Sequence, residues 1–313
     1  MPSARLPALL TAAVALAVAA AAAAGPARQA AKPSLEGTWA QNYVQVFESP
    51  PKWPALVVSE ADAKTVGDIE TRQINAFFGP LDPEVPYLLA GTQGPPLVRG
   101  QRRTRILVDP ADGKMPYRPQ VLKQMSGPQP PDKRDNPEER PGVERCLTGV
   151  GQPPLVGLSF AYLLQIVRTK DAVAIHTEYG DEVRVVPITD RHSPKTLFGR
   201  LGDSIGHWEG ETLVVETIGL PDADSFRLGP MFLVSGDARI TERFTPVSDR
   251  ELLYQFTVDD PKFYTGPWRA EYSWYRTAKP MYEHACHEGN YALPNVLSGA
   301  RYEEAQRGAR PSP

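Results

Sequence analysis

Cysteine is scarce in this chain of 313 residues, which contains only Cys146 and Cys286. No CxxC spacing and no paired His/Cys spacing accompanies them, so the sequence indicates no metal site. A Gly-rich phosphate loop is missing as well. The sequence therefore predicts no cofactor.

Blocks of one charge sign are also lacking. The chain has 34 Lys and Arg against 37 Asp and Glu, and these residues are interspersed. A nucleic-acid-binding protein would carry a basic stripe, so this class of partner is excluded. After residue 24 no apolar run is long enough to cross a bilayer, which predicts no stable membrane insertion of the mature chain. The oligomeric state has no signature in the sequence.

The first residues have the composition of a secretory signal peptide. Arg5 is followed by an apolar run from Leu6 to Ala24 that ends in small residues, the pattern that signal peptidase recognises. A retained membrane anchor is the alternative, but the run is Ala-rich and barely long enough. We therefore predict a signal peptide over residues 1–24 and a periplasmic or secreted mature protein.

Export makes a disulfide permissible. Both cysteines are flanked by charged residues, which favours one bridge between Cys146 and Cys286 over two unrelated buried thiols. Such a bridge would close a loop of about 140 residues and stabilise the fold by on the order of 5 kcal/mol.

The N-terminal part, residues 25–127, has mixed α and β signals. A strand is expected at 35–39, and the capping box Ser59-Glu60-Ala61-Asp62 begins a helix that extends to about Phe78. A strand is expected at 105–109 and a short helix at 117–125. The chain has 33 Pro residues, which crowd into an extended crossing at 128–154 because Pro cannot occupy a helix interior or a central strand.

The body, residues 155–299, consists of short β segments separated by turn residues. Gly180-Asp181 and Gly210-Glu211 are typical of hairpin connections. A meander that closes has no unpaired edges, so the sequence predicts a mainly β fold with an antiparallel up-and-down, lipocalin-like barrel or a strongly curved sheet. The tail, residues 300–313, is predicted to be disordered. The expected strands lie at 162–169, 172–179, 182–187, 207–209, 212–218, 237–245, 251–258, 269–276 and 281–287.

Two motifs resemble those of a family of exported bacterial proteins that has no established activity. They are GDSIGHWEGETLVVET at residues 202–217 and CHEGNY at residues 286–291, followed by SGAR at 298–301. Shorter stretches at 145–147, 165–167 and 183–187 also resemble this family. The chain departs from the family pattern at His284, where Tyr is common, and at Arg239 or Ile240, where His occurs.

A weaker resemblance is to lipocalins and other calycins, which open their barrel with Gly-x-Trp. The chain contains this pattern at 37–39 and at 206–208. The resemblance implies a small barrel that holds one apolar ligand in its interior.

Alternate residues of a strand share a face, which places candidate ligand-binding residues on the body. Glu178 and Arg184 lie on neighbouring predicted strands and could pair, either on a solvated face or inside the barrel as anchors for a polar ligand group. Trp208, Tyr272 and Trp274 are predicted to line the core or a cavity.

A polar cluster follows the last predicted strand. His287 and Glu288 are the candidate acid–base pair, and Asn290 is the candidate hydrogen-bond donor. A structural plug beside the disulfide is the alternative. Ser204 matches the letters of a nucleophile elbow, but a hairpin follows it where that motif requires a helix.

Three functions remain open from the sequence. The leading interpretation is a periplasmic, lipocalin-like protein that binds a small apolar or aromatic ligand. The alternatives are a lyase, isomerase or hydratase that uses His287 and Glu288 on such a ligand, and an envelope structural or interaction module.

Overall fold

The structure is a computed structural model. The predicted signal peptide and parts of the Pro-rich crossing lie outside the described residues. Among the described residues, no helix combines the length and apolarity needed to span a membrane. The described residues are 33–41, 46–78, 95–126, 135–140, 142, 144–147, 150–156, 163–222, 226–227 and 232–308, without the side chains of 70, 71, 73–78, 226 and 227.

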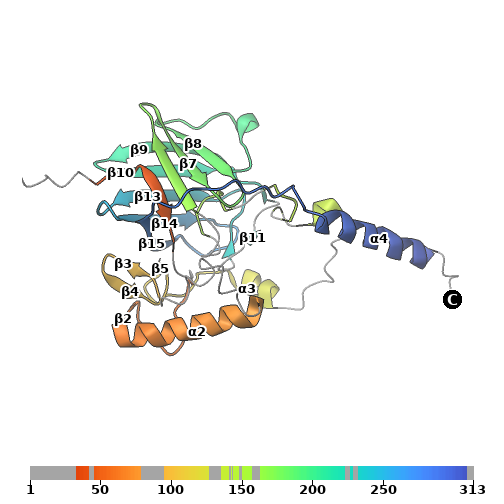
Figure 1. The fold of residues 1–313 in the computed structure, drawn as a ribbon, viewed down its shortest axis with the longest axis horizontal. Coiled ribbons are helices and arrows are strands. Elements are labelled where there is room, and N and C mark those ends of the chain that lie inside the picture. Colours follow the sequence, from red (N-terminus) through yellow and green to blue (C-terminus); the bar gives the residue numbers. More distant parts are fainter. Residues whose placement is uncertain are drawn as a thin grey trace, which may run out of the picture. The chain divides into compact units, whose positions relative to one another are not determined.

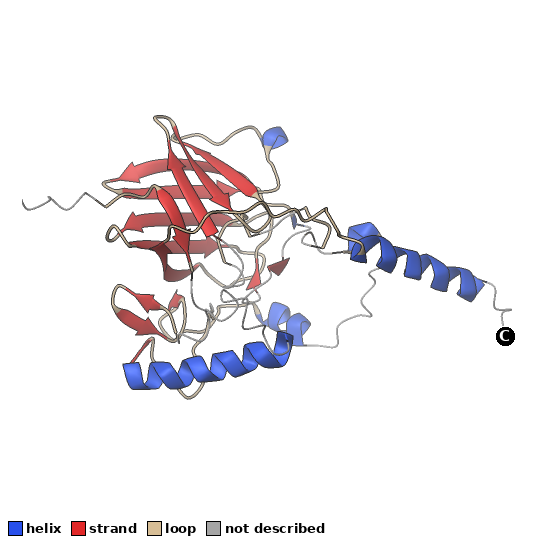
Figure 2. Ribbon diagram, in the orientation of Figure 1, coloured by secondary structure: helices blue, strands red, loops and turns tan. Residues whose placement is uncertain are grey.

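A large antiparallel sheet curves into a nearly closed barrel, which confirms the predicted fold class (Figures 1 and 2). Its order is β8-β7-β6-β1-β15-β14-β13-β10-β9, and β5 adds to β15. The strands are β1 (Gly37–Ala40), β5 (Leu107–Asp109), β6 (Leu163–Arg168), β7 (Ala172–Thr177), β8 (Glu182–Pro187), β9 (Asp203–Glu209), β10 (Thr212–Ile218), β13 (Arg239–Pro246), β14 (Glu251–Asp259) and β15 (Trp268–Arg276).

The two predicted hairpins are confirmed. β7 pairs with β8 across Gly180 and Asp181, which have φ values of 94° and 51°. Residues in this left-handed region supply the tight reversal that a hairpin needs. β9 pairs with β10 across Gly210-Glu211, and Gly210 has a φ of 62°.

The sheet closes through a parallel seam between its first and last strands. Nine strands follow one another along the path, and every neighbouring pair is antiparallel, so β8 and β9 must run in the same direction. The seam holds a parallel bridge between Ile188 and Gly206, and the Thr189 amide donates to the Gly206 carbonyl at 3.1 Å. Parallel neighbours need a long crossover, and residues 188–202 provide it.

One predicted strand is wrong. Residues 281–287 form no strand. The position beside β15 is already taken by β1, which pairs with β15 through Trp39 and Arg276 and with β6 through Trp39 and Leu164. The segment after β15 therefore finds no free ladder there.

The N-terminal part contains the two predicted helices, α2 (Glu60–Phe78) and α3 (Pro119–Ser126). Ser59 caps α2, because its hydroxyl accepts the Asp62 amide at 3.1 Å. A small sheet, which the sequence did not suggest, orders β2 (Val57–Val58), β4 (Gln101–Arg103) and β3 (Leu97–Val98). The remaining elements are the pair β11 (Phe226–Arg227) and β12 (Phe232–Leu233), and two 3₁₀ turns at Pro137–Glu139 and Lys195–Leu197.

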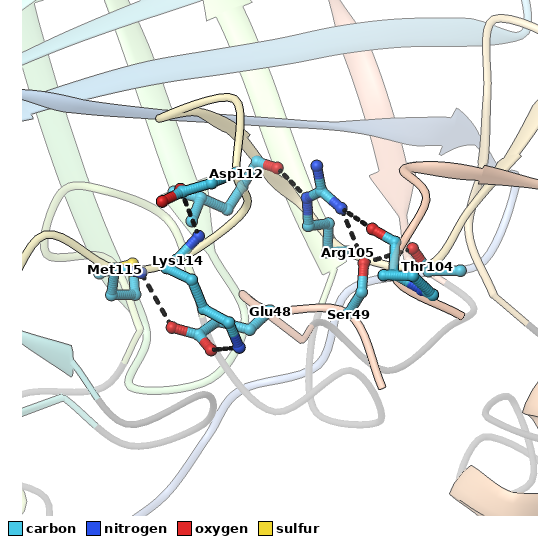
Figure 3. Close-up of polar contacts among 9 residues, drawn as sticks. Glu48, Ser49, Thr104, Arg105, Asp112, Lys114 and Met115 are labelled. Atoms are coloured by element: carbon cyan, nitrogen blue, oxygen red, sulfur yellow. Dashed lines mark hydrogen bonds and ion pairs between the residues drawn. The ribbon is translucent and has the colours of Figure 1, made fainter. Parts of the chain in front are cut away.

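A buried arginine organises the loops of the N-terminal part (Figure 3). Arg105 donates to the Ser49 hydroxyl at 2.8 Å and to the carbonyls of Pro54 at 2.7 Å and Leu107 at 2.9 Å. The guanidinium has five N–H donors in a fixed geometry, so it can donate to several loop carbonyls at once. Without it, these carbonyls would need hydrogen bonds from water. Arg105 therefore holds three chain segments together from one point.

The C-terminal segment is tied to the body by the predicted disulfide. The sulfur atoms of Cys146 and Cys286 lie 2.07 Å apart, which confirms the predicted pairing. Helix α4 (Ala292–Gly308) follows and has no buried residue. Residues 300–308, predicted as disordered, belong to this helix, and residues 309–313 lie outside the described residues.

The tightness of the seam can be tested at Gly206. A Cβ atom added there would lie 2.9 Å from Val186 Cγ1, whereas one added at Gly199 meets nothing within 4 Å. We expect Gly206→Ala to lower the free energy of unfolding by about 1–3 kcal/mol, because Val is stiff and cannot move aside. Urea denaturation measures this change.

Gly199→Ala is the matched control, since both variants add one methyl group near the same crossover. It should leave the unfolding midpoint nearly unchanged. Equal midpoints for the two variants would mean that β8 and β9 are not packed closely at Gly206.

Candidate functional site

The inward face of β8 carries a charged residue. Arg184 is 4% exposed and Val186 is buried, whereas Val183 and Val185 are 52% and 58% exposed on the opposite face. This strand therefore buries a charged side chain, Arg184, and exposes the apolar side chains of Val183 and Val185, which is the reverse of an ordinary half-buried strand. Of the two alternatives for Arg184, the placement inside the barrel is the one observed.

Arg184 forms a buried two-bond ion pair with Glu242 of β13. Its two terminal nitrogens donate to the two carboxylate oxygens at 2.5 and 2.9 Å. Burial lowers the pKa of Arg184, but the charge of Glu242 outweighs it and the net shift is upward. The guanidinium therefore stays charged in the core.

Two tyrosines extend this pair to a loop of the chain. The Tyr254 hydroxyl donates to Glu242 Oε1 at 2.7 Å and accepts the Leu155 amide at 2.8 Å. The Tyr272 hydroxyl donates to the Leu155 carbonyl. Burial raises the pKa of Tyr254 well above its ordinary value, and the charge of Glu242 raises it further, so the phenol keeps its proton.

Two more side chains complete what we call the inner network. Thr217 of β10 accepts from Arg184 at 3.5 Å and shares a 2.7 Å hydrogen bond with Ser204 of β9. The network consists of Arg184, Ser204, Thr217, Glu242, Tyr254 and Tyr272. The network crosses the seam on the inside of the barrel, because Arg184 belongs to β8 and Ser204 belongs to β9.

Residues 151–156, which we call the plug segment, occupy the interior beside this network. All six are buried. Glu182 accepts the Gly151 amide at 2.8 Å, and the Gln152 side chain donates to the Arg200 carbonyl at 2.8 Å. The end of the predicted crossing therefore does more than join two parts of the chain, because it enters the barrel.

Aromatic side chains fill much of the barrel interior. Trp268, Tyr272 and Trp274 on β15 and Phe256 on β14 have almost no exposed surface, so no water-sized space adjoins them. Tyr272 and Trp274 thus lie in the interior as predicted, with ring centroids 5.9 Å apart. Trp208 is only partly buried, and the Arg168 guanidinium lies over its ring at 4.1 Å.

The structure separates the remaining predicted residues from this interior. Glu178 accepts the amides of Leu163 at 3.1 Å and Tyr282 at 2.9 Å, so its expected pairing with Arg184 is replaced by the Arg184–Glu242 pair. In the register of the hairpin, Arg184 faces Ile175 while Glu178 lies beyond the end of β7.

The C-terminal polar cluster lies beside the disulfide. Asn290 donates to the Glu144 carbonyl at 3.1 Å and contacts Cys146 Sγ at 3.3 Å. These contacts are those expected if the cluster has the structural role beside the disulfide, which was the alternative to a catalytic role. His287 and Glu288 are exposed, and within the described residues their side chains make no hydrogen bond or ion pair. A catalytic role for the two residues stays a prediction.

A second polar group, which the sequence analysis missed, lies on the outer face of the seam. His192 of the crossover contacts Asp203 through Nδ1 at 2.6 Å and Glu216 through Nε2 at 3.0 Å, and Arg239 pairs with Glu216. We call these four residues the His192 cluster. Asp203 and Glu216 are the sequence neighbours of Ser204 and Thr217 in the 202–217 motif. This motif was the sequence feature that could have pointed to the cluster. The position of His192 against them depends on the crossover.

The described residues contain no group of three or more His, Cys, Asp or Glu side chains arranged to hold a metal ion. The contacts of His192 with Asp203 and Glu216 tie the crossover to β9 and β10. Comparisons with family models, with curated proteins and with solved structures give no match for this chain.

The pH dependence of stability tests the His192 cluster. Burial raises the pKa of Asp203, but hydrogen bonds from His192 and Ser193 outweigh it and lower that pKa. Burial also raises the pKa of Glu216, and hydrogen bonds from Arg239 and then His192 outweigh it there. A lowered carboxyl pKa adds stability that is fully present above about pH 4.5 and is lost as the pH falls through the lowered values. We expect His192→Asn to reduce the difference in unfolding free energy between pH 7 and pH 3.

The control is His207→Asn. His207 also contacts a carboxylate, Glu209, but the lowered pKa of Glu209 is caused first by Arg243. Urea denaturation at the two pH values should give this control a pH dependence like that of the unmodified protein. A pH dependence that is the same in all three proteins would count against the cluster.

Proposed function

We propose that this protein is an exported, lipocalin-like binding protein that takes a small ligand with apolar or aromatic character into its barrel. The observation that carries the proposal is the pair of hydrogen bonds at Leu155, whose amide donates to Tyr254 and whose carbonyl accepts from Tyr272. In this conformation the plug segment occupies the place that a ligand would take.

The cost of the inner network supports this proposal. Removing two charges from water costs several kcal/mol per ion, and replacing a buried ion pair with apolar residues is often neutral or stabilising. A barrel that only had to be filled needs no Arg184–Glu242 pair. Buried charges that converge on polar groups are more typical of recognition sites.

The irregular structure of the plug segment is a second support. The barrel satisfies its own backbone through strand ladders, so the phenols of Tyr254 and Tyr272 are not needed for that purpose. They bind instead a segment outside the sheet, which contains Pro153 and Pro154 and forms no ladder. A ligand that offers the same hydrogen-bonding groups could replace this segment without disturbing the sheet.

Export is part of the proposal. The predicted signal peptide and the Cys146–Cys286 pair support a periplasmic or secreted location, because disulfides persist in oxidising compartments. Membership of the exported family whose motifs the chain resembles stays a prediction.

Native mass spectrometry of protein purified from its own periplasm tests the function. We expect a noncovalent mass above that of the processed chain, and its loss after mild organic extraction. Hydrogen exchange at the Leu155 amide should then slow, because the plug segment returns to the interior once the ligand has left.

Exchange at the Ile175 amide is the internal control, since it belongs to the β6–β7–β8 ladders and should not respond to extraction. The proposal would be contradicted by a mass equal to that of the chain alone together with no binding of any apolar probe by the extracted protein. The barrel would then be a packed core without a ligand site. The envelope module would then be the better interpretation.

A further inference from the structure

The hydrogen-bond pattern around Leu155 defines a specific ligand class. Tyr254 accepts from the Leu155 N–H, and Tyr272 donates to the Leu155 C=O, so both contacts belong to one residue. The N–H and C=O flank a single α-carbon, with the aliphatic side chain between them. A simple amide does not offer this arrangement, because its N–H and C=O belong to the same planar group and point apart.

We propose that the barrel binds an N-acylated aliphatic α-amino-acid unit, as found inside a peptide or in an N-acyl amino acid. This inference rests on the proposed function, and it names the ligand class for the same interior site. Leu155 acts as an internal stand-in for that ligand.

The two phenols are held in position for this task. Tyr254 and Tyr272 lie opposite each other in the β14–β15 register, with ring centroids 5.1 Å apart. Glu242 accepts a hydrogen bond from the Tyr254 hydroxyl, which leaves the phenol oxygen to accept an N–H. Arg184 fixes Glu242 in turn through two bonds. The acceptor for the ligand N–H is therefore set by a chain of buried contacts.

Charge in the interior selects a neutral ligand. Glu242 neutralises Arg184, so the inner network as described offers no unpaired cation to a free carboxylate. A buried carboxylate without a partner is costly. The site should therefore prefer a unit whose carboxyl is amidated over a free amino acid or a free acid.

The test uses the full-length chain with a weakened plug segment, Leu155→Asn. The unmodified segment competes at the high effective concentration of an intramolecular ligand, and a polar side chain at this apolar position reduces that competition. Calorimetric titration with N-acetyl-leucine amide should show saturable binding. N-Acetyl-leucine with a free carboxylate should bind at least about tenfold more weakly.

Methylation of the ligand nitrogen tests the Tyr254 contact. N-Acetyl-N-methyl-leucine amide has no N–H to donate, so we expect about tenfold weaker binding in Leu155→Asn. In the double variant Leu155→Asn/Tyr254→Phe, the methylated and unmethylated ligands should bind equally. If Tyr254→Phe does not fold, Tyr272→Phe in the same background should bind the unmethylated ligand about tenfold more weakly and keep the sensitivity to methylation.

Two further ligands distinguish the sources of the unit. A blocked tripeptide with central leucine represents a peptide, and a long-chain N-acyl-leucine amide represents an acyl amino acid. Binding of either supports the proposal, and the tighter one identifies the source. Binding of an apolar probe without an amide, together with no binding of any leucine derivative, would overturn the inference while the proposed function stands. If Leu155→Asn binds none of these compounds, both the inference and the proposed function are wrong.

Discussion

The number and direction of the barrel strands constrain the rest of the structure. Nine strands joined by antiparallel pairs bring two parallel edges together, so the last contact of the barrel cannot be another hairpin. The chain therefore needs the crossover at 188–202, and the seam it closes has only a bridge between Ile188 and Gly206 in place of a full ladder.

Side chains on both faces of the seam make contacts across it that the incomplete ladder does not make. On the inside, Arg184 reaches from β8 past β9 and β10 to Glu242, with Ser204 and Thr217 in the same network. On the outside, His192 ties the crossover to β9 and β10. The two polar clusters therefore lie on opposite faces of the same seam.

Local sequence signals predicted what depends on neighbouring residues. The Ser59 cap, the turns at 180–181 and 210–211 and the positions of β13, β14 and β15 follow from residue type and alternation over a few positions. The Cys146–Cys286 pairing also followed, because two cysteines leave one possible bridge within the chain.

Contacts between distant segments could not be read in this way. β1 has four residues, and nothing in them indicates that they insert between β6 and β15. That insertion is the reason why residues 281–287 form no strand. The partner of Arg184 lies 58 positions along the chain, and only the closed barrel brings Glu242 nearer than Glu178.

The energy of the plug segment determines how the proposed site would behave. Burial of one leucine side chain stabilises by roughly 1.5–3 kcal/mol, and each hydrogen bond adds about 1 kcal/mol. Together, the Leu155 side chain and its hydrogen bonds to Tyr254 and Tyr272 hold the segment in place by about 3.5–5 kcal/mol. A ligand gains access to the interior only in the small population where these contacts are broken. Its apparent affinity is therefore reduced by about a thousandfold, which only a ligand that remakes the same contacts can offset.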